Sequence, residues 1–558
     1  MDSQRLVLFF VFTMSVFLLY EGWQRDLQAT AKANVETAAI PRPSVEANGQ
    51  PKAGSAALPV PSAPLTTPAA APASAATPAV ATAKTVKVET DVYLAEISTA
   101  GGDLVGLRLK KHGGTLDPKK NFILFDRAAD HTYVAQSGLI GNGLPNHQSA
   151  YTVSAESFVL ADGQDKLEVR LEAADGSKGA KIYRFQRNSY VIDVSHELTN
   201  GGAAPVDAHA YFQLLRDTKA PEGDSAMVPT YTGPAVYTDK EKFQKVAFGD
   251  IDKNKLPYPK TANDGWIGIV QHYFLGAWLP KEGAPREYYT KAVQAGLYAA
   301  GVIVPVGTLA PGASTTVSMP LYAGPQEQEK LAALAPGLEL AVDYGWLTVI
   351  AAPLFWVLQW VHGWTGNWGV AIIILTVLIK LLFYPLSEAS YRSMAKMRVV
   401  APKMQSLKDR YGDDRQRLQQ AMMELYKTEK INPLGGCLPI LVQIPVFIAL
   451  YWVLLASVEM RQAPFALWIT DLSTPDPWYI LPVLMGATMI IQTRLNPEPP
   501  DPVQAKVMKI MPVAFSIFFF FFPAGLVLYW LVNNILSIAQ QWKINRALEG
   551  AAKPARKS

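Results

Sequence analysis

Lys380 is the only charged residue in an apolar run that covers residues 368–384. A run of this length and composition is typical of a helix that crosses a membrane. A charge within the hydrocarbon core is costly, so such a residue usually faces a polar cavity and takes part in function. The sequence therefore predicts a membrane helix whose lysine lies in a polar cavity.

The composition is that of a membrane protein that carries a soluble domain. Of 558 residues, 49% are hydrophobic and 18% are charged, and long apolar stretches lie near both ends of a polar middle. The net charge of +4 is too small to indicate a nucleic-acid partner by itself. The single cysteine, Cys437, excludes an internal disulfide, and no Cys/His cluster indicates zinc or redox chemistry. We therefore expect no metal and no cofactor.

The first 335 residues divide into three parts. Residues 1–28 contain the apolar stretch 6–20 with no evident cleavage site after it, which favours an uncleaved transmembrane anchor over a signal peptide. Residues 29–85 are rich in Ala and Pro, which predicts a disordered tether. Residues 86–335 alternate apolar with polar residues between turn signals, which predicts a large all-β sandwich domain.

The remaining chain is predicted to be an α-helical polytopic membrane bundle. Residues 343–364 have an apolar face and tryptophans at intervals of four, which predicts an amphipathic helix on the membrane surface. A helix packed on the soluble domain is the alternative. Residues 365–543 are predicted to form a core of five spans. We expect these spans at residues 367–386, 435–456, 478–494, 509–522 and 525–543.

The distribution of basic residues predicts the orientation of the spans. The loop 387–432 carries ten Lys and Arg residues, whereas the loop 459–477 carries only Arg461. Because basic loops stay in the cytoplasm, the first loop is expected inside and the β domain outside, with both termini cytoplasmic. The tail 544–558 is also basic and is expected to contact ribosomal RNA or anionic lipid. The basic residues at this end of the chain are Lys543, Arg546, Lys553, Arg556 and Lys557.

The cytoplasmic loop 387–432 has the periodicity of a helical hairpin. An ordinary hairpin with a charged, solvated surface explains the pattern as structure. Methionine side chains also adapt to varied apolar partners, which leaves open a role in receiving apolar segments. The apolar face that we expect to serve this role holds Met394, Met397, Met404, Leu407 and Met422.

Polar residues occur within the spans, and none of them lies near an outer end. This asymmetry predicts a cavity that is open to the cytoplasm and closed outside. The alternative is that the amides and threonines bond between helices, as they often do in membranes. An unpaired cation in such a cavity would attract a solute anion or an acidic stretch of polypeptide. The residues expected to line the cavity are Lys380, Thr376, Gln443, Thr488, Gln492, Asn533 and Asn534.

Several short motifs resemble those of the bacterial membrane protein insertase family YidC. They are GNWG at 366–369, YPL at 384–386, SMAKMR at 393–398, NPLGGC at 432–437, RQAPF at 461–465, ILP at 480–482 and GLVLYW at 525–530. The resemblance extends nearly end to end, with QHYF at 271–274 its best local match in the β domain. The family usually has an arginine where this chain has Lys380, which keeps the charge but loses the bidentate fork. Trp530 stands where the family has the second tyrosine of a Tyr-Tyr pair.

The resemblance implies a membrane insertase and chaperone of the Gram-negative inner membrane with a periplasmic β-supersandwich domain. It implies that nascent membrane proteins enter a hydrophilic groove, alone or beside the Sec translocon, with translating ribosomes and membrane lipids as further partners. Apolar segments would slide along Phe447, Phe515 and Phe518. Burial of the apolar segment in lipid would drive insertion, so no ATP site is needed, and no P-loop motif is present. An insertase of this kind is not expected to be an enzyme.

Two functions of other classes remain as alternatives from the sequence. A secondary transporter of an anionic solute would also need a buried cation, although such proteins tend to contain internal repeats and none is found here. A membrane-tethered enzyme would place chemistry in the β domain, where His196 and His272 lie. Lone histidines in strands are more often structural.

Overall fold

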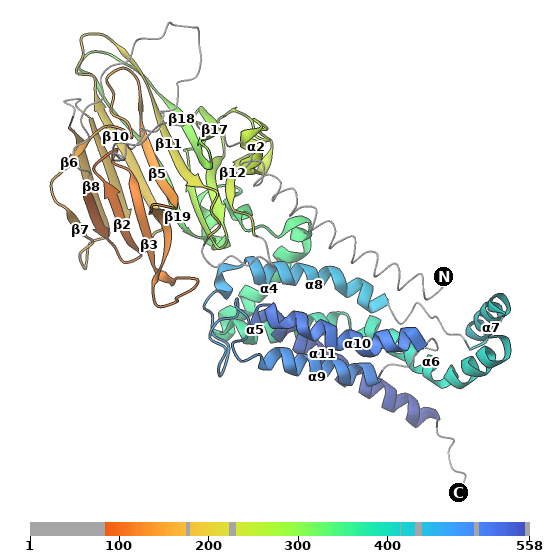
Figure 1. Ribbon diagram of the computed structural model, residues 1–558. Helices are drawn as coiled ribbons and strands as arrows, with labels where there is room; N and C mark the ends of the chain where they lie inside the picture. The colour runs from red at the N-terminus through yellow and green to blue at the C-terminus, as the bar shows by residue number, and fades with distance from the viewer. Residues whose placement is uncertain are drawn as a thin grey trace, which may run out of the picture.

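The computed structural model describes residues 84–174, 179–221, 230–412, 414–429, 438–495 and 502–552. These residues form a β domain at one end of an elongated molecule and a group of helices at the other (Figure 1). The predicted anchor 1–28 and almost all of the predicted tether 29–85 lie outside the described residues, as does Cys437. The prediction of a large all-β domain followed by a helical region is confirmed.

The β domain consists of two stacked sheets. Its strands are β1 (Thr85–Glu89), β2 (Tyr93–Ser98), β3 (Leu104–Gly113), β4 (Asn121–Arg127), β5 (Thr132–Ile140), β6 (Tyr151–Val153), β7 (Ser157–Val159), β8 (Lys166–Ala173), β9 (Gly179–Gln186), β10 (Val191–Thr199), β11 (Val206–Asp217), β12 (Gly233–Thr238), β13 (Lys242–Lys245), β14 (Thr261–Ala262), β15 (Trp266–Gln271), β16 (Phe274–Trp278), β17 (Arg286–Gln294), β18 (Leu297–Leu309) and β19 (Ser314–Pro325). One sheet has the order β14-β17-β18-β11-β5-β4-β3-β2-β1-β7, and the other has the order β13-β12-β15-β16-β19-β10-β9-β8-β6.

The period-two pattern of the sequence explains why these segments are strands. In β8, Val169 and Leu171 are buried while Glu168 and Arg170 are exposed. Successive side chains of a strand point to opposite faces, so this alternation gives each sheet one apolar face. The main core cluster of the β domain contains apolar residues of both sheets, and a smaller cluster of Val134, Leu215, Leu297 and Ala299 lies apart from it.

The helical region follows the β domain directly. Its helices are α3 (Gln328–Leu334), α4 (Thr348–Thr365), α5 (Trp368–Leu382), α6 (Tyr384–Tyr411), α7 (Arg415–Thr428), α8 (Leu438–Ala456), α9 (Ile480–Leu495), α10 (Pro502–Phe518) and α11 (Ala524–Ala552), with the short helix α2 (Phe248–Asp252) inside the β domain. The 3-10 helices are η1 (Leu338–Ala341), η2 (Gly345–Leu347), η4 (Val458–Met460) and η5 (Phe519–Phe521). The α6–α7 hairpin lies at the end of the molecule farthest from the β domain (Figure 1).

The chain bends sharply between α5 and α6. The helix that we expected over residues 367–386 ends at Leu382, and α6 starts at Tyr384. Pro385 explains the break, because proline lacks a backbone N–H and is favoured in the first turn of a helix. Among the described residues no single helix is long and apolar enough to span a membrane, whereas α5 and the first part of α6, bent by 66°, meet these criteria as a pair.

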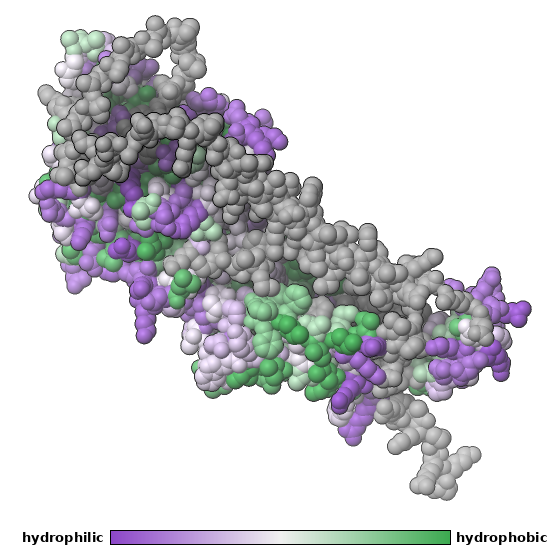
Figure 2. Space-filling view, viewed as in Figure 1, coloured by the Kyte–Doolittle hydropathy of each residue, from purple (hydrophilic) through white to green (hydrophobic). Residues whose placement is uncertain are grey.

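The surface of the helical region is apolar in its middle. Figure 2 shows hydrophobic side chains gathered there, and hydrophilic ones over the β domain and the α6–α7 hairpin. Helices α9 and α10 contribute many of these exposed apolar side chains. An extended exposed apolar surface is typical of a surface that faces lipid or a partner. Those with about half or more of their surface exposed include Val483, Leu484, Ile491, Ile510, Val513 and Ile517.

Candidate functional site

Lys380 lies in the last turn of α5 and is buried. Its Nζ donates a hydrogen bond to Oγ of Ser537 on α11 over 2.7 Å. Ser537 in turn donates to the backbone oxygen of Asn533, also over 2.7 Å, so its hydroxyl acts as acceptor and donor at once. No carboxylate in the described ranges pairs with Lys380. The ammonium has three N–H donors, and the described residues supply one acceptor for them.

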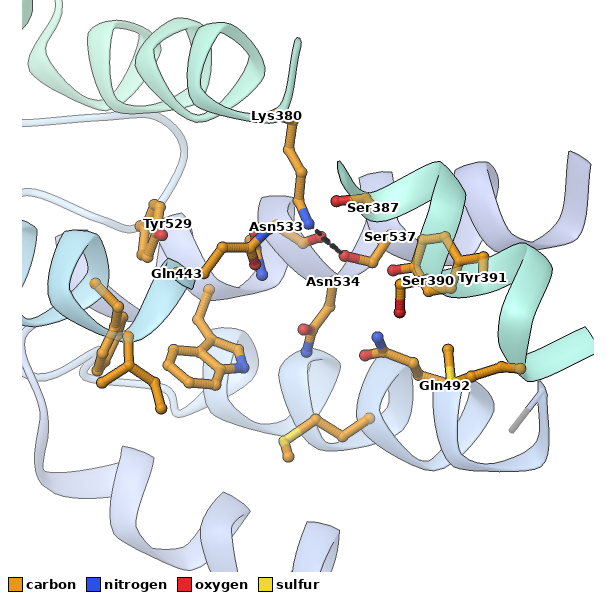
Figure 3. A pocket seen from close by; sticks show the side chains of 15 residues that line it. Lys380, Ser387, Ser390, Tyr391, Gln443, Gln492, Tyr529, Asn533, Asn534 and Ser537 are labelled. Atoms are coloured by element: carbon orange, nitrogen blue, oxygen red, sulfur yellow. Dashed lines mark hydrogen bonds between the residues drawn. The ribbon is translucent and has the colours of Figure 1, made fainter. Parts of the chain in front are cut away.

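A cavity of about 300 Å³ opens in front of this ammonium group. Figure 3 shows Lys380 pointing into it from α5, with polar side chains converging from α6, α8, α9 and α11. A cavity of this volume with several polar groups can hold water or part of a chain. The polar residues that line it are Lys380, Ser387, Ser390, Tyr391, Gln443, Gln492, Tyr529, Asn533, Asn534 and Ser537.

Five of the seven polar residues selected from the sequence line this cavity, namely Lys380, Gln443, Gln492, Asn533 and Asn534.

The two threonines lie elsewhere. Thr376 is buried and its hydroxyl donates to the backbone oxygen of Ile372 in its own helix. Thr488 accepts a 3.3 Å hydrogen bond from Asn534 Nδ2, so it supports a lining residue without lining the cavity.

Sequence reasoning missed the contribution of α6 and of Ser537. The sequence pattern places the segment from residue 387 in the cytoplasmic hairpin, yet Ser387, Ser390 and Tyr391 line the cavity. The bend before α6 brings its first turns beside the end of α5, and Pro385 was the signal for it. Ser537 was detectable by its spacing, four residues after Asn533 on the same helical face.

Aromatic side chains close one end of the cavity. Phe447 contacts Trp530 edge-to-face at 4.5 Å between ring centroids, and Trp530 contacts Phe519 at 5.3 Å. Phe447 also lines the cavity and is partly buried. Phe518 is half exposed at the end of α10. Phe515 lies on the same helix, and the structure does not describe its side chain.

The hairpin methionines occupy two environments. Met397, Met404 and Met422 pack together in the hairpin's own core, and Leu407 is half-buried. Met394 lines the cavity instead.

Of the basic residues at the end of the chain, two are described. Lys543 and Arg546 are exposed on α11, and Arg546 lies over the ring of Trp542 at 5.3 Å. Lys553, Arg556 and Lys557 lie outside the described residues.

The two histidines that the enzyme alternative singled out, His196 and His272, have structural partners. His196 is buried, and its Nε2 lies 3.0 Å from Ser137 Oγ. His272 Nε2 lies 3.1 Å from the backbone oxygen of Leu455 in α8.

Comparisons with known proteins agree along the whole chain. The family model described as the YidC periplasmic domain matches residues 85–357, and the one described as 60Kd inner membrane protein matches residues 360–551. The chain is 56% identical to the membrane protein insertase YidC of Nitrosospira multiformis, covering 99% of this chain and 98% of that one. It is also 56% identical to the protein of the same name in Aromatoleum aromaticum, with complete coverage of both.

A crystal structure of an active YidC insertase is also similar, at 20% identity and a TM-score of 0.39, covering 82% of this chain and 92% of that one. The comparisons do not support the transporter that the buried cation left open.

Proposed function

The chain belongs to the YidC family of membrane protein insertases, and we propose that it receives the polar part of a nascent membrane protein in the Lys380 cavity. One observation carries this proposal. Lys380 Nζ faces a cavity with a single hydroxyl as its hydrogen-bond acceptor and no carboxylate beside it among the described residues. A buried ammonium in this state gains free energy when an anionic or carbonyl oxygen of a polypeptide approaches it.

The amides around the cavity would serve the rest of the polar segment. Gln443, Gln492, Asn533 and Asn534 each offer both a donor and an acceptor. A peptide backbone that enters from water therefore finds partners in place of its hydration shell. The apolar segment that follows would leave along the half-exposed Phe518, with Phe447 at the cavity wall and Phe515 on the same helix as Phe518.

Burial of the apolar segment in lipid drives the final step in this proposal. About 0.8 kcal/mol is gained per buried CH₂ group, so a helix of about 20 apolar residues needs no nucleotide to insert. The protein's task is to shorten the apolar path that the polar groups cross.

The topology that suits this mechanism has six spans and two cytoplasmic termini. The family places the β domain in the periplasm and the protein in the inner membrane. The α6–α7 hairpin lies at the opposite end of the molecule, where the cavity would face the cytoplasm (Figure 1). The basic residues of the hairpin fit this orientation by the positive-inside rule.

Translating ribosomes, the Sec translocon and membrane lipids are the further partners that we propose. Lys543 and Arg546 are exposed at the end of α11, where phosphate groups of RNA or lipid can reach them. A chain truncated after Trp542 should bind ribosomes carrying a nascent membrane protein more weakly, and the difference should shrink as salt rises. Sedimentation with such ribosomes across a salt series measures this, and equal binding at every salt concentration would assign these residues to lipid.

Site-directed crosslinking tests the proposed entry of substrate. A photoreactive side chain at Gln443 should crosslink to a stalled single-span nascent chain once its polar N-terminal segment has left the ribosome. The same probe at Leu116, which is 70% exposed on the β domain, is the control. Equal crosslinking at both positions would exclude the cavity as the entry site.

A further inference from the structure

Two of the motifs singled out in the sequence contact each other at the start of α5. Asn367 caps this helix, because its side chain accepts from the backbone N–H of Val370 over 3.0 Å. Its Nδ2 also donates to the backbone oxygen of Phe465 over 2.8 Å. The Phe465 ring lies directly on Gly369, where any Cβ atom would overlap it. The RQAPF segment therefore holds the first turn of the helix that carries Lys380.

The other end of the same segment holds the β domain. Arg461 Nη2 donates to the backbone oxygen of Gly113 over 2.6 Å, at the end of β3. Gln462 accepts from the N–H of Gly113 over 3.1 Å. The Arg461 guanidinium also lies over the rings of Phe122 and Phe274, at 5.4 and 5.5 Å from their centroids.

The chain crosses from one core to the other within a few residues here. Val458 belongs to the buried core of the β domain, whereas Met460 and Ala463 belong to that of the helices. A segment held by both cores has little freedom to move independently of either.

The distance along α5 from Gly369 to Lys380 links the contact of Phe465 with Gly369 to the cavity. Lys380 follows Gly369 by eleven residues. At 1.5 Å per residue this is about 16 Å, so a tilt of α5 by about 10° at its first turn moves Lys380 by about 3 Å. With the Lys380 side chain in its present conformation, such a displacement takes Nζ beyond hydrogen-bond distance of Ser537 Oγ, which lies 2.7 Å away in the structure.

We propose that residues 461–465 are a positioning clamp, which fixes the tilt of α5 against the β domain and thereby places Lys380 in its cavity. Arg461 and Gln462 grip the end of β3, and Phe465 with Asn367 fixes the first turn of α5. The clamp rests on the proposed function, in that it serves the Lys380 cavity as the working site.

A charge-sensitive probe in the cavity tests the clamp. The only native thiol is removed by Cys437→Ser, and a thiol is introduced by Asn533→Cys. Its reaction rate with an anionic methanethiosulfonate is divided by the rate with a neutral one of similar size. A unit charge about 6 Å away in a water-like medium changes this ratio about threefold. Lys380→Gln therefore sets the low reference.

Gly369→Ala should lower the ratio toward that reference, because the new methyl group pushes α5 away from Phe465. Phe465→Ala in the same chain should restore it by making room. Gly363→Ala in α4 is the matched control, since a Cβ there meets nothing within 4 Å, and it should leave the ratio unchanged. Insertion of a single-span substrate into liposomes should follow the ratio in all variants.

An unchanged ratio in Gly369→Ala, or no recovery in the double variant, would overturn the clamp. If Gly369→Ala does not accumulate as folded protein, Arg461→Ala is measured instead. A ratio in Arg461→Ala equal to that of the protein carrying only Cys437→Ser and Asn533→Cys would overturn the proposal. The ratio needs no substrate, so a protein that inserts nothing would refute the proposed function while the clamp is still judged.

Discussion

Removal of the Ser537 hydroxyl should destabilise the protein in part by removing the hydrogen bond that it accepts from Lys380. Ser537 is 2% exposed and supplies the one hydrogen-bond acceptor that the described residues offer to the Lys380 ammonium. A hydrogen bond to a charged group contributes about 1.5–3 kcal/mol in soluble proteins. Side-chain hydrogen bonds between membrane helices average only about 0.6 kcal/mol and reach about 1.7. Because Lys380 is charged, we expect a coupling energy near the upper membrane value, about 1.5 kcal/mol.

A double-mutant cycle isolates this energy. The free energy of unfolding is measured in mixed detergent micelles for the unsubstituted protein, Ser537→Ala, Lys380→Met and the double variant. Ser537→Ala should cost about 1.5 kcal/mol more with Lys380 present than with Met at that position. The helix propensity of alanine cancels in the cycle. A coupling energy below about 0.5 kcal/mol would mean that cavity water, and not Ser537, satisfies the ammonium group.

Two further predictions concern buried carboxylates outside the cavity. Asp476→Ala should lower the free energy of unfolding by about 2–4 kcal/mol in the same micelle assay. The reason is that the Asp476 carboxylate accepts hydrogen bonds from the N–H of Leu481 at the start of α9 and from Trp468 Nε1. A loss below about 1 kcal/mol would refute this. In the β domain, burial raises the pKa of Asp103 to about 6 and lowers the pKa of Lys181 to about 8. The folded state thus holds the Asp103 proton between about pH 4 and 6, and releases the Lys181 proton between about pH 8 and 10.5. Relative to a chain carrying Asp103→Asn and Lys181→Met, the melting temperature should fall with rising pH in the first window and rise with it in the second, and a constant difference would contradict the assignment.

The regular parts of the fold were predictable because short local patterns in the sequence indicate the secondary structure and the buried face. The alternation in β8 gives the strand and its buried face without reference to any other segment. In the same way, the position of Lys380 in an apolar run marks it as a functional residue without reference to its partners. Asp414 also caps α7 by accepting from the backbone N–H of Arg417, and an aspartate just before a helical pattern is a local signal of this kind.

The rest depends on how segments turn relative to one another. Ser387 and Ser390 join the cavity because the chain bends by 66° after Leu382, and periodicity carries no information on direction. The methionines at 397, 404 and 422 have the spacing of an exposed apolar face, yet the hairpin folds them against each other. The contact of Phe465 with Gly369 joins motifs almost a hundred residues apart, and no local pattern predicts it.

The central claim is that a positive charge in the cavity captures the polar segment of the substrate. The direct test is insertion into liposomes, measured by protease protection of a single-span substrate with an acidic N-terminal segment and of a matched one with a neutral segment. Lys380→Arg should insert both at nearly the unsubstituted rate. Lys380→Glu reverses one unit charge, which about 6 Å from a carboxylate in a water-like medium is worth about a tenfold rate. The account predicts a loss of at least that size for the acidic substrate and a smaller loss for the neutral one. Insertion of the acidic substrate by Lys380→Glu at the unsubstituted rate would contradict it.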